Sequence, residues 1–212
     1  MIRSNFIKRF LSSIALIIIL YFVLNSNSSL FFIFFILTLI ISIIELKNIS
    51  SGFFFVIGIL FILFSFFTIF QIKIVNIEIF YLLLIIVIGT DIGGYLFGKI
   101  IGGPKLTKIS PSKTFSGVAG SLIMSQVFTF IYIKSYQNSL TDFNYDNYST
   151  VIKILILSIV SQFGDLTISY FKRLSNVKDT GKLIPGHGGL LDRVDGIMLA
   201  IPTSYLILIN LN

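Results

Sequence analysis

The chain has 212 residues, of which 55% are hydrophobic and only 12% are charged. A soluble domain of this length needs about a quarter of its residues charged, so this composition excludes an ordinary soluble protein. The mean hydropathy of +0.97 points the same way. The chain has no cysteine, which excludes disulfides and thiolate metal sites. Lipid is therefore the expected solvent for most of the chain.

Seven stretches are long and apolar enough to cross a membrane as helices. Backbone groups cannot stay unpaired in hydrocarbon, and these runs are too uniform for the alternating strands of a membrane barrel. The first stretch follows a basic flank and lacks a cleavage pattern of small residues, so we expect it to be retained. We predict an all-α, polytopic membrane bundle with spans at residues 6–24, 30–46, 53–71, 77–98, 117–135, 150–171 and 193–211.

The basic residues predict an orientation for this bundle. With the N-terminus inside and the spans alternating, thirteen of the sixteen Lys and Arg residues fall on the cytoplasmic side. The three others are Lys73, Lys134 and Lys153. The positive-inside rule therefore favours an N-in, C-out arrangement. Two basic, glycine-containing loops, residues 99–117 and 172–193, then face the cytoplasm. Attraction to anionic lipid would by itself account for their charge.

Asp165 lies within an otherwise apolar predicted span. Asp165, Ser169 and Lys172 are spaced i, i+4 and i+7, so they share one helical face. A carboxylate at membrane depth is costly, and it marks a functional site unless it serves a structural ion pair. Lys172 or Arg173 could provide such a pair, so both interpretations stay open at this point.

Asp192 and Asp195 begin the last predicted span and lie on one helical face. A carboxylate there is favoured by the helix dipole, so capping is one interpretation. One Asp would suffice for a cap. Two carboxylates beside Arg193, with Asp165 as a further intramembrane acid, fit a site for Mg²⁺, which prefers oxygen ligands and shares its shell with water and phosphates.

The loop between these acids holds the only histidine, His187, among glycines. A single histidine is more often an ordinary loop residue than a catalyst. Here it lies close in sequence to Lys and Arg donors, to carboxylates and to glycines such as Gly188 and Gly189. Phosphoryl-type transfer needs this combination, because it depends on positioning and on neutralisation of charge.

Residues 169–195, SYFKRLSNVKDTGKLIPGHGGLLDRVD, resemble the signature of the phosphatidate cytidylyltransferase (CDP-diacylglycerol synthase) family. The family pattern has Ser, Lys-Arg, Lys-Asp, His-Gly-Gly and Asp-Arg-x-Asp at these spacings. A second block is similar to the family's other cytoplasmic region, with Asp91 to Lys99 and the Ser-Pro-x-Lys-Thr run at residues 110–114. The resemblance covers about residues 80–210. We therefore divide the chain into hydrophobic spans of weak resemblance, 1–76, and a catalytic membrane region, 77–212.

The resemblance implies synthesis of CDP-diacylglycerol and pyrophosphate from CTP and phosphatidic acid. It implies a membrane-embedded homodimer in the bacterial inner membrane, with its active site facing the cytoplasm. Magnesium, alone or with a second cation, is the expected cofactor, with Asp165, Asp192 and Asp195 as its ligands. The expected catalytic residues are Asp165, Lys172, Arg173, Lys178, Asp179, His187, Asp192, Arg193 and Asp195. The expected substrate- and nucleotide-binding residues are Ser169, Gly188, Gly189, Asp91, Lys99, Ser110, Lys113 and Thr114.

Within that set, Lys172, Arg173, Lys178 and Arg193 are expected to bind phosphates. Asp179 would orient Lys178 or act on the metal. Two other functions remain as alternatives. A CTP-dependent kinase of polyprenol- or phytol-type lipid alcohols shares parts of the motif and would release CDP. A membrane transporter would also place acids in its spans, but the charges cluster at one face and no inverted repeat is evident. Membrane lipid is an expected partner and nucleic acid is not.

Overall fold

The computed structural model describes residues 2–136, 140 and 147–209. In this part of the chain the regular structure is helical, and only isolated β-bridges occur besides the helices. The helices are α1 (Ile2–Leu24), α2 (Ser28–Ile49), α3 (Gly52–Val75), α4 (Ile77–Ile100), α5 (Phe115–Ser135), α6 (Tyr148–Leu174) and α7 (Leu191–Ile209). Each predicted span falls on one of these helices and differs from it by about a turn or less at either end. The all-α prediction is therefore confirmed.

Five helical segments are long and apolar enough to cross a membrane: Ser29–Ile49, Gly52–Val75, Ile77–Ile100, Phe115–Ser135 and Tyr148–Leu174. α1 contributes a shorter apolar stretch, Ile14–Leu24. Large apolar side chains are exposed along these helices, including Phe53 at 74%. Water would not tolerate so much exposed apolar surface, whereas lipid does. The chain is an integral membrane protein on these grounds. The count of seven spans and the N-in orientation stay predictions.

Polar residues set where several helices begin. The Asn27 side chain accepts a hydrogen bond from the Leu30 amide at the start of α2. Asn76 does the same for α4, and the Thr114 hydroxyl accepts from the Gly117 amide to begin α5. Each cap satisfies amide groups that have no partner within the helix. The short polar joints between apolar runs therefore act as helix starts.

Contacts group the chain into two compact units, Met1–Leu63 with Phe171–Val194, and Phe64–Tyr170 with Asp195–Asn212. The division at residue 76 drawn from the sequence follows resemblance, not packing, and it stays a prediction. The first unit contains α1, α2, the start of α3 and the loop between α6 and α7. In this unit the C-terminal end of α2 holds that loop, because Ser175 donates to the Ile49 carbonyl (2.7 Å) and Asn48 to the Thr180 carbonyl (3.0 Å).

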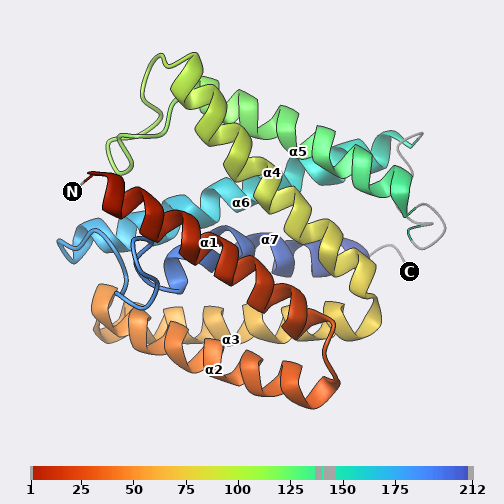
Figure 1. Cartoon of the computed structure of the whole chain (residues 1–212), viewed down its shortest axis with the longest axis horizontal. Coiled ribbons are helices and arrows are strands. Elements are labelled where there is room, and N and C mark those ends of the chain that lie inside the picture. The colour runs from red at the N-terminus through yellow and green to blue at the C-terminus, as the bar shows by residue number, and fades with distance from the viewer. Residues whose placement is uncertain (1, 137–139, 141–146, 210–212) are drawn as a thin grey trace. The chain divides into compact units, whose positions relative to one another are not determined.

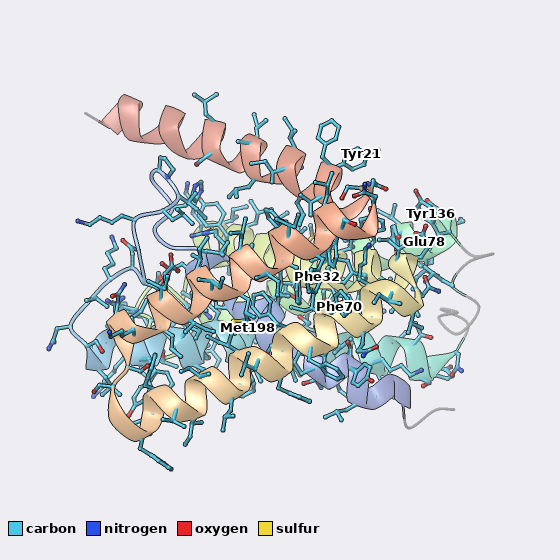
Figure 2. All side chains as sticks on the ribbon, turned by 90° about the horizontal axis from the view of Figure 1, so that it is seen from below. Tyr21, Phe32, Phe70, Glu78, Tyr136 and Met198 are labelled. Carbon is cyan, nitrogen blue, oxygen red and sulfur yellow. The ribbon has the colours of Figure 1, made fainter. Side chains whose placement is uncertain are left out.

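The second unit is built around α4 and α5, which cross side by side (Figure 1). Hydroxyl groups tie its helices together: Ser121 donates to the Thr90 carbonyl (2.7 Å), and Thr90 donates to Ser158 on α6 (2.8 Å). Such bonds replace the hydrophobic effect, which cannot hold helices together in lipid. At one end of this unit the labelled Glu78 and Tyr136 lie near each other (Figure 2). The Tyr132 ring packs against the Tyr136 ring at a tilt of 32°, and the Tyr132 hydroxyl donates to Glu78.

Candidate active site

The loop between α6 and α7 folds into a pocket of about 510 Å³ within the first unit. α6 ends where Asn176 adopts a left-handed backbone (φ 54°) and the Val177 amide donates to the Lys172 carbonyl. A tight turn follows, with paired hydrogen bonds between Ile184 and Gly188. Gly186, at the tip of this turn, has a φ of 78°, which favours glycine. The pocket is lined by Lys178, Asp179, Gly181, Lys182, Ile184, Pro185, Gly186, His187, Gly188 and Arg193.

The lining of this pocket is predominantly cationic. Its charged residues are three cations, Lys178, Lys182 and Arg193, and one carboxylate, Asp179. The Arg193 guanidinium donates to the His187 carbonyl (3.2 Å), which holds the histidine turn against the start of α7. Ammonium and guanidinium donors around a concave surface are the usual means of binding phosphate groups. The structure therefore brings together four predicted catalytic residues, Lys178, Asp179, His187 and Arg193.

Beside the pocket lining, Lys172 and Asp192 form a buried ion pair. The Lys172 Nζ lies 2.6 Å from Asp192 Oδ1, and their side chains are 11% and 5% exposed. Asp192 Oδ2 accepts from the Thr180 amide (2.8 Å), the Thr180 hydroxyl (3.0 Å) and the Gly189 amide (3.0 Å). Burial would raise the pKa of the Asp192 carboxyl, but the Lys172 ammonium and the two amides outweigh burial and hold that pKa below its ordinary value. Asp192 is therefore an ionised, tightly held carboxylate.

The two glycines after His187 accommodate this carboxylate. A side chain at Gly188, which has a φ of 87°, would meet Asp192 Oδ2 and Asp179. The Gly189 amide binds Asp192 directly. These glycines were predicted to bind substrate, and in the structure the anion at the Gly189 amide is the chain's own carboxylate.

α1 also contributes to this site. Ser12 donates to the Pro185 carbonyl (3.0 Å), and its oxygen lies 2.8 Å from His187 Nδ1. The blue loop accordingly runs beside α1 in Figure 1. A hydroxyl that donates to a carbonyl can still accept from an imidazole N–H. α1, which lies outside the signature, therefore contacts the histidine turn.

A second group of predicted site residues lies in the other unit. Lys113 Nζ is 2.6 Å from Asp165 Oδ2, and both side chains are partly exposed, at 24% and 34%. Ser169 donates to Asp165 Oδ1 (3.3 Å). On the same stretch of α6, Gly164 packs on the Asp195 backbone so closely that a Cβ would lie 2.5 Å from the Asp195 carbonyl oxygen. The loop before α5 thus supplies a cation to the acid of α6, and the backbone near the start of α7 packs against the same helix.

The remaining predicted residues make local contacts. Lys99 donates to Tyr95 (3.3 Å), and the Ser110 amide donates to Thr107 (3.1 Å). Thr114 caps α5. Asp91 on α4 and Arg173 at the end of α6 are exposed, and Arg173 donates to the Val177 carbonyl (3.3 Å). Direct roles in binding nucleotide stay predictions for these residues.

The three predicted metal ligands supply only carboxylate oxygens, the chemistry that magnesium prefers. In the structure, however, Lys113 pairs with Asp165 and Lys172 pairs with Asp192. Among the described residues, no three His, Asp or Glu side chains gather closely enough to hold a metal ion. The donor type fits magnesium, but the observed arrangement does not form its site, so magnesium stays a prediction.

Four residues of the first unit were missed by sequence reasoning: Ser12, Glu45, Thr180 and Lys182. Lys182 lies within the signature and could have been chosen for its charge. Glu45 also carried a signal, because it is the only acidic residue among the first 77 and lies in an apolar run. Ser12 and Thr180 have no distinguishing pattern, since small hydroxyl residues are common in such helices and loops.

The chain is similar to known proteins of one family. A model of the cytidylyltransferase family matches residues 3–211. A phosphatidate cytidylyltransferase of Staphylococcus haemolyticus is 42% identical over 123 residues, which are 58% of this chain and 45% of that protein. The enzyme of the same name from Haemophilus influenzae is 44% identical over 124 residues, 56% of this chain and 41% of its own. The match spans less than half the length of these relatives.

Proposed function

The chain belongs to the cytidylyltransferase family, and from that premise we propose that it is a phosphatidate cytidylyltransferase. It would convert CTP and phosphatidic acid into CDP-diacylglycerol and pyrophosphate. The observation that carries the proposal is the pocket in the α6–α7 loop, where Lys178, Lys182 and Arg193 surround a volume of about 510 Å³. A polyanion such as a nucleoside triphosphate is the ligand that this charge favours.

In the proposed reaction, a phosphate oxygen of phosphatidic acid attacks the α-phosphorus of CTP. The new P–O bond forms as the bond from the α-phosphorus to the bridging oxygen breaks, and pyrophosphate carries away the bonding electrons. The attacking oxygen is already an anion at neutral pH, so no strong general base is needed. The main requirement is to bring two polyanions together, which falls to the Lys and Arg side chains.

Each group of residues has a place in this scheme. The cationic pocket would bind the triphosphate, with His187 orienting it from the turn that Ser12 supports. A substrate phosphate would take the place of Asp192 beside the Lys172 ammonium, which would then neutralise the charge of that phosphate. Lys113, Asp165 and Ser169 of the second unit, with Asp91, Lys99, Ser110 and Thr114, would serve the nucleotide side.

Magnesium belongs to the proposal as a cofactor that would neutralise charge between phosphate groups when bound. Asp165 and Asp192, once released from Lys113 and Lys172, would hold it together with Asp195, and a second cation could bind beside it. A test that does not depend on turnover is thermal unfolding of the detergent-purified protein. Mg²⁺ with CTP should raise the unfolding temperature more than either alone, and Asp192→Asn should remove the difference. Equal temperatures with and without Mg²⁺ would contradict the metal assignment.

The membrane setting completes the proposal. An N-in arrangement in the bacterial inner membrane would place the α6–α7 loop on the cytoplasmic side, where CTP is available, while the acyl chains of phosphatidic acid stay in lipid. A homodimer is also proposed, on family resemblance alone.

The deciding experiment uses purified protein with labelled CTP, Mg²⁺ and phosphatidic acid, and follows pyrophosphate and CDP-lipid together. Equal amounts of both products support the proposal. Release of CDP in the presence of a lipid alcohol would instead indicate a lipid kinase. If CTP is not consumed with any lipid, the transporter hypothesis should be tested by measuring flux into liposomes. Glu78→Gln is a suitable control, because Glu78 is not among the predicted site residues and its carboxylate accepts a hydrogen bond from Tyr132.

A further inference from the structure

Glu45 is a buried carboxylate within the apolar helix α2. Its side chain belongs to a residue only 5% exposed, in a segment apolar enough to span a membrane. Its Oε1 accepts from the Leu190 amide (3.0 Å), and its Oε2 accepts from the Leu191 amide (2.8 Å) and the Thr180 hydroxyl (2.9 Å). A buried carboxylate persists only when such donors replace its water. All of these contacts lie within the first unit.

The two amides belong to the start of α7. The first amides of a helix have no partner within it, and together they form the positive end of the helix dipole. Glu45 supplies the missing acceptor from another helix. It therefore fixes the point at which α7 begins, one residue before Asp192.

Two glycines of the α6–α7 loop make room for Glu45. A Cβ on Gly181 would lie 2.9 Å from the Glu45 Cδ, and a Cβ on Gly189 would lie 2.6 Å from the same atom. Real Cβ atoms do not approach other atoms so closely. The backbone of the loop is thus shaped around this one carboxylate as well as around Asp192.

Thr180 connects the two carboxylates. Its hydroxyl lies 2.9 Å from Glu45 Oε2 and 3.0 Å from Asp192 Oδ2, and its amide also donates to Asp192. A hydroxyl has one proton to donate, so the two acids compete for it. A change at Glu45 must therefore alter the donors that hold Asp192.

We propose that Glu45 is a positioning residue of the active site, which acts through Thr180 and the first amides of α7 to place Asp192 against Lys172. This inference rests on the proposed function and extends it to a helix outside the signature. Glu45 is not expected to touch either substrate.

The substrate-free test measures hydrogen–deuterium exchange of peptides covering residues 186–193 in the detergent-purified full chain. Glu45→Gln offers one acceptor oxygen where the carboxylate has two, and its amide group would face an N–H donor. Exchange of the Leu190 and Leu191 amides should rise about tenfold or more in this variant, as expected for an opened helix start. Glu78→Gln, which changes the only other glutamate of the chain, should leave these peptides unchanged. Unchanged exchange in Glu45→Gln overturns the proposal.

The kinetic test separates positioning from a purely structural role. Glu45→Gln and Thr180→Val should each lower kcat about tenfold or more while KM for CTP changes little, since the cationic pocket is kept. The double variant should lose less activity than the product of the two single losses, because part of the effect of Glu45 on Asp192 passes through the Thr180 hydroxyl. Thr180→Ser, which keeps the hydroxyl, should restore most of kcat.

Multiplied losses in the double variant, or a wild-type kcat in Glu45→Gln despite faster exchange, would overturn the positioning role. If the wild-type chain does not turn over CTP at all, the proposed function fails by that result. The exchange experiment still reports by itself whether Glu45 holds the start of α7. Thermal unfolding of each variant confirms that it is folded before either test is read.

Discussion

Asp192 is held by several hydrogen-bond donors at once. One ammonium, two amides and a hydroxyl surround it, and it is nearly inaccessible. Removal of one member of a buried pair leaves the other charge without compensation. Asp192 therefore stabilises the fold, and the proposed function also gives it a part in the chemistry, so the two contributions must be measured separately.

Asp192→Asn should lower the unfolding free energy by about 3 kcal/mol, because Lys172 stays charged and buried. Turnover should fall at least about a hundredfold, as expected when a group that binds the reacting phosphates is lost. Thermal unfolding and CTP turnover measure the two effects. Adding Lys172→Met should recover part of the stability and none of the activity. Near wild-type turnover in Asp192→Asn would sink its assignment.

The Lys113–Asp165 pair is more exposed than the Lys172–Asp192 pair. Partly exposed pairs contribute about 1 kcal/mol or less, because water screens them. Lys113→Met should therefore shift the unfolding temperature only slightly. If Lys113 binds nucleotide as predicted, KM for CTP should rise about tenfold. A variant with unchanged KM and lowered stability would assign Lys113 a structural role only.

At the scale of elements, glycines allow α4 and α5 to cross closely. A Cβ on Gly93 would lie 2.7 Å from the Gly120 backbone and 2.8 Å from the Met124 Cβ. In lipid, helices associate through such close packing and through hydrogen bonds between them. α4 also carries the exposed Asp91 and Lys99 on the turns around this crossing. The crossing therefore fixes the positions of these two predicted nucleotide-binding residues within the second unit.

Gly93→Ala should destabilise the protein by about 1–3 kcal/mol, because the new methyl group meets backbone that cannot move aside. Ile92→Ala, one residue earlier at a 37% exposed position, is the matched control and should have a much smaller effect. Thermal unfolding in detergent measures both. If the two variants unfold at the same temperature, the close crossing does not stabilise the protein.

At the scale of the whole molecule, orientation is testable because the chain contains no cysteine. Single cysteines can be introduced at Ser112, in the exposed 101–114 loop, and at Tyr148, which is 86% exposed. The N-in arrangement predicts that a membrane-impermeant maleimide labels Tyr148→Cys in intact cells. It should label Ser112→Cys only after the membrane is opened. The reverse pattern would contradict the positive-inside argument, and the unmodified chain controls for background labelling.

The helices could be predicted closely from the sequence because apolar runs and polar joints are local signals. Lipid forces each run to satisfy its own backbone, so helix follows from composition without knowledge of the neighbours. The signature at residues 169–195 was equally local, and the contacts of Lys172 with Asp192 and of Arg193 with the histidine turn lie within it.

The sequence by itself determined that this chain is a helical membrane protein of the cytidylyltransferase family, with nine of its sixteen basic residues in the two segments 99–117 and 172–193. Only the tertiary structure decided which charges meet: Lys113 with Asp165, Lys172 with Asp192, and Glu45 with the start of α7. Ser12 and Glu45 belong to helices outside the signature at residues 169–195, and their partners lie 135 or more positions away along the chain. Periodicity reports the face of a helix, but not what covers that face, because the covering residues come from distant segments brought together by packing.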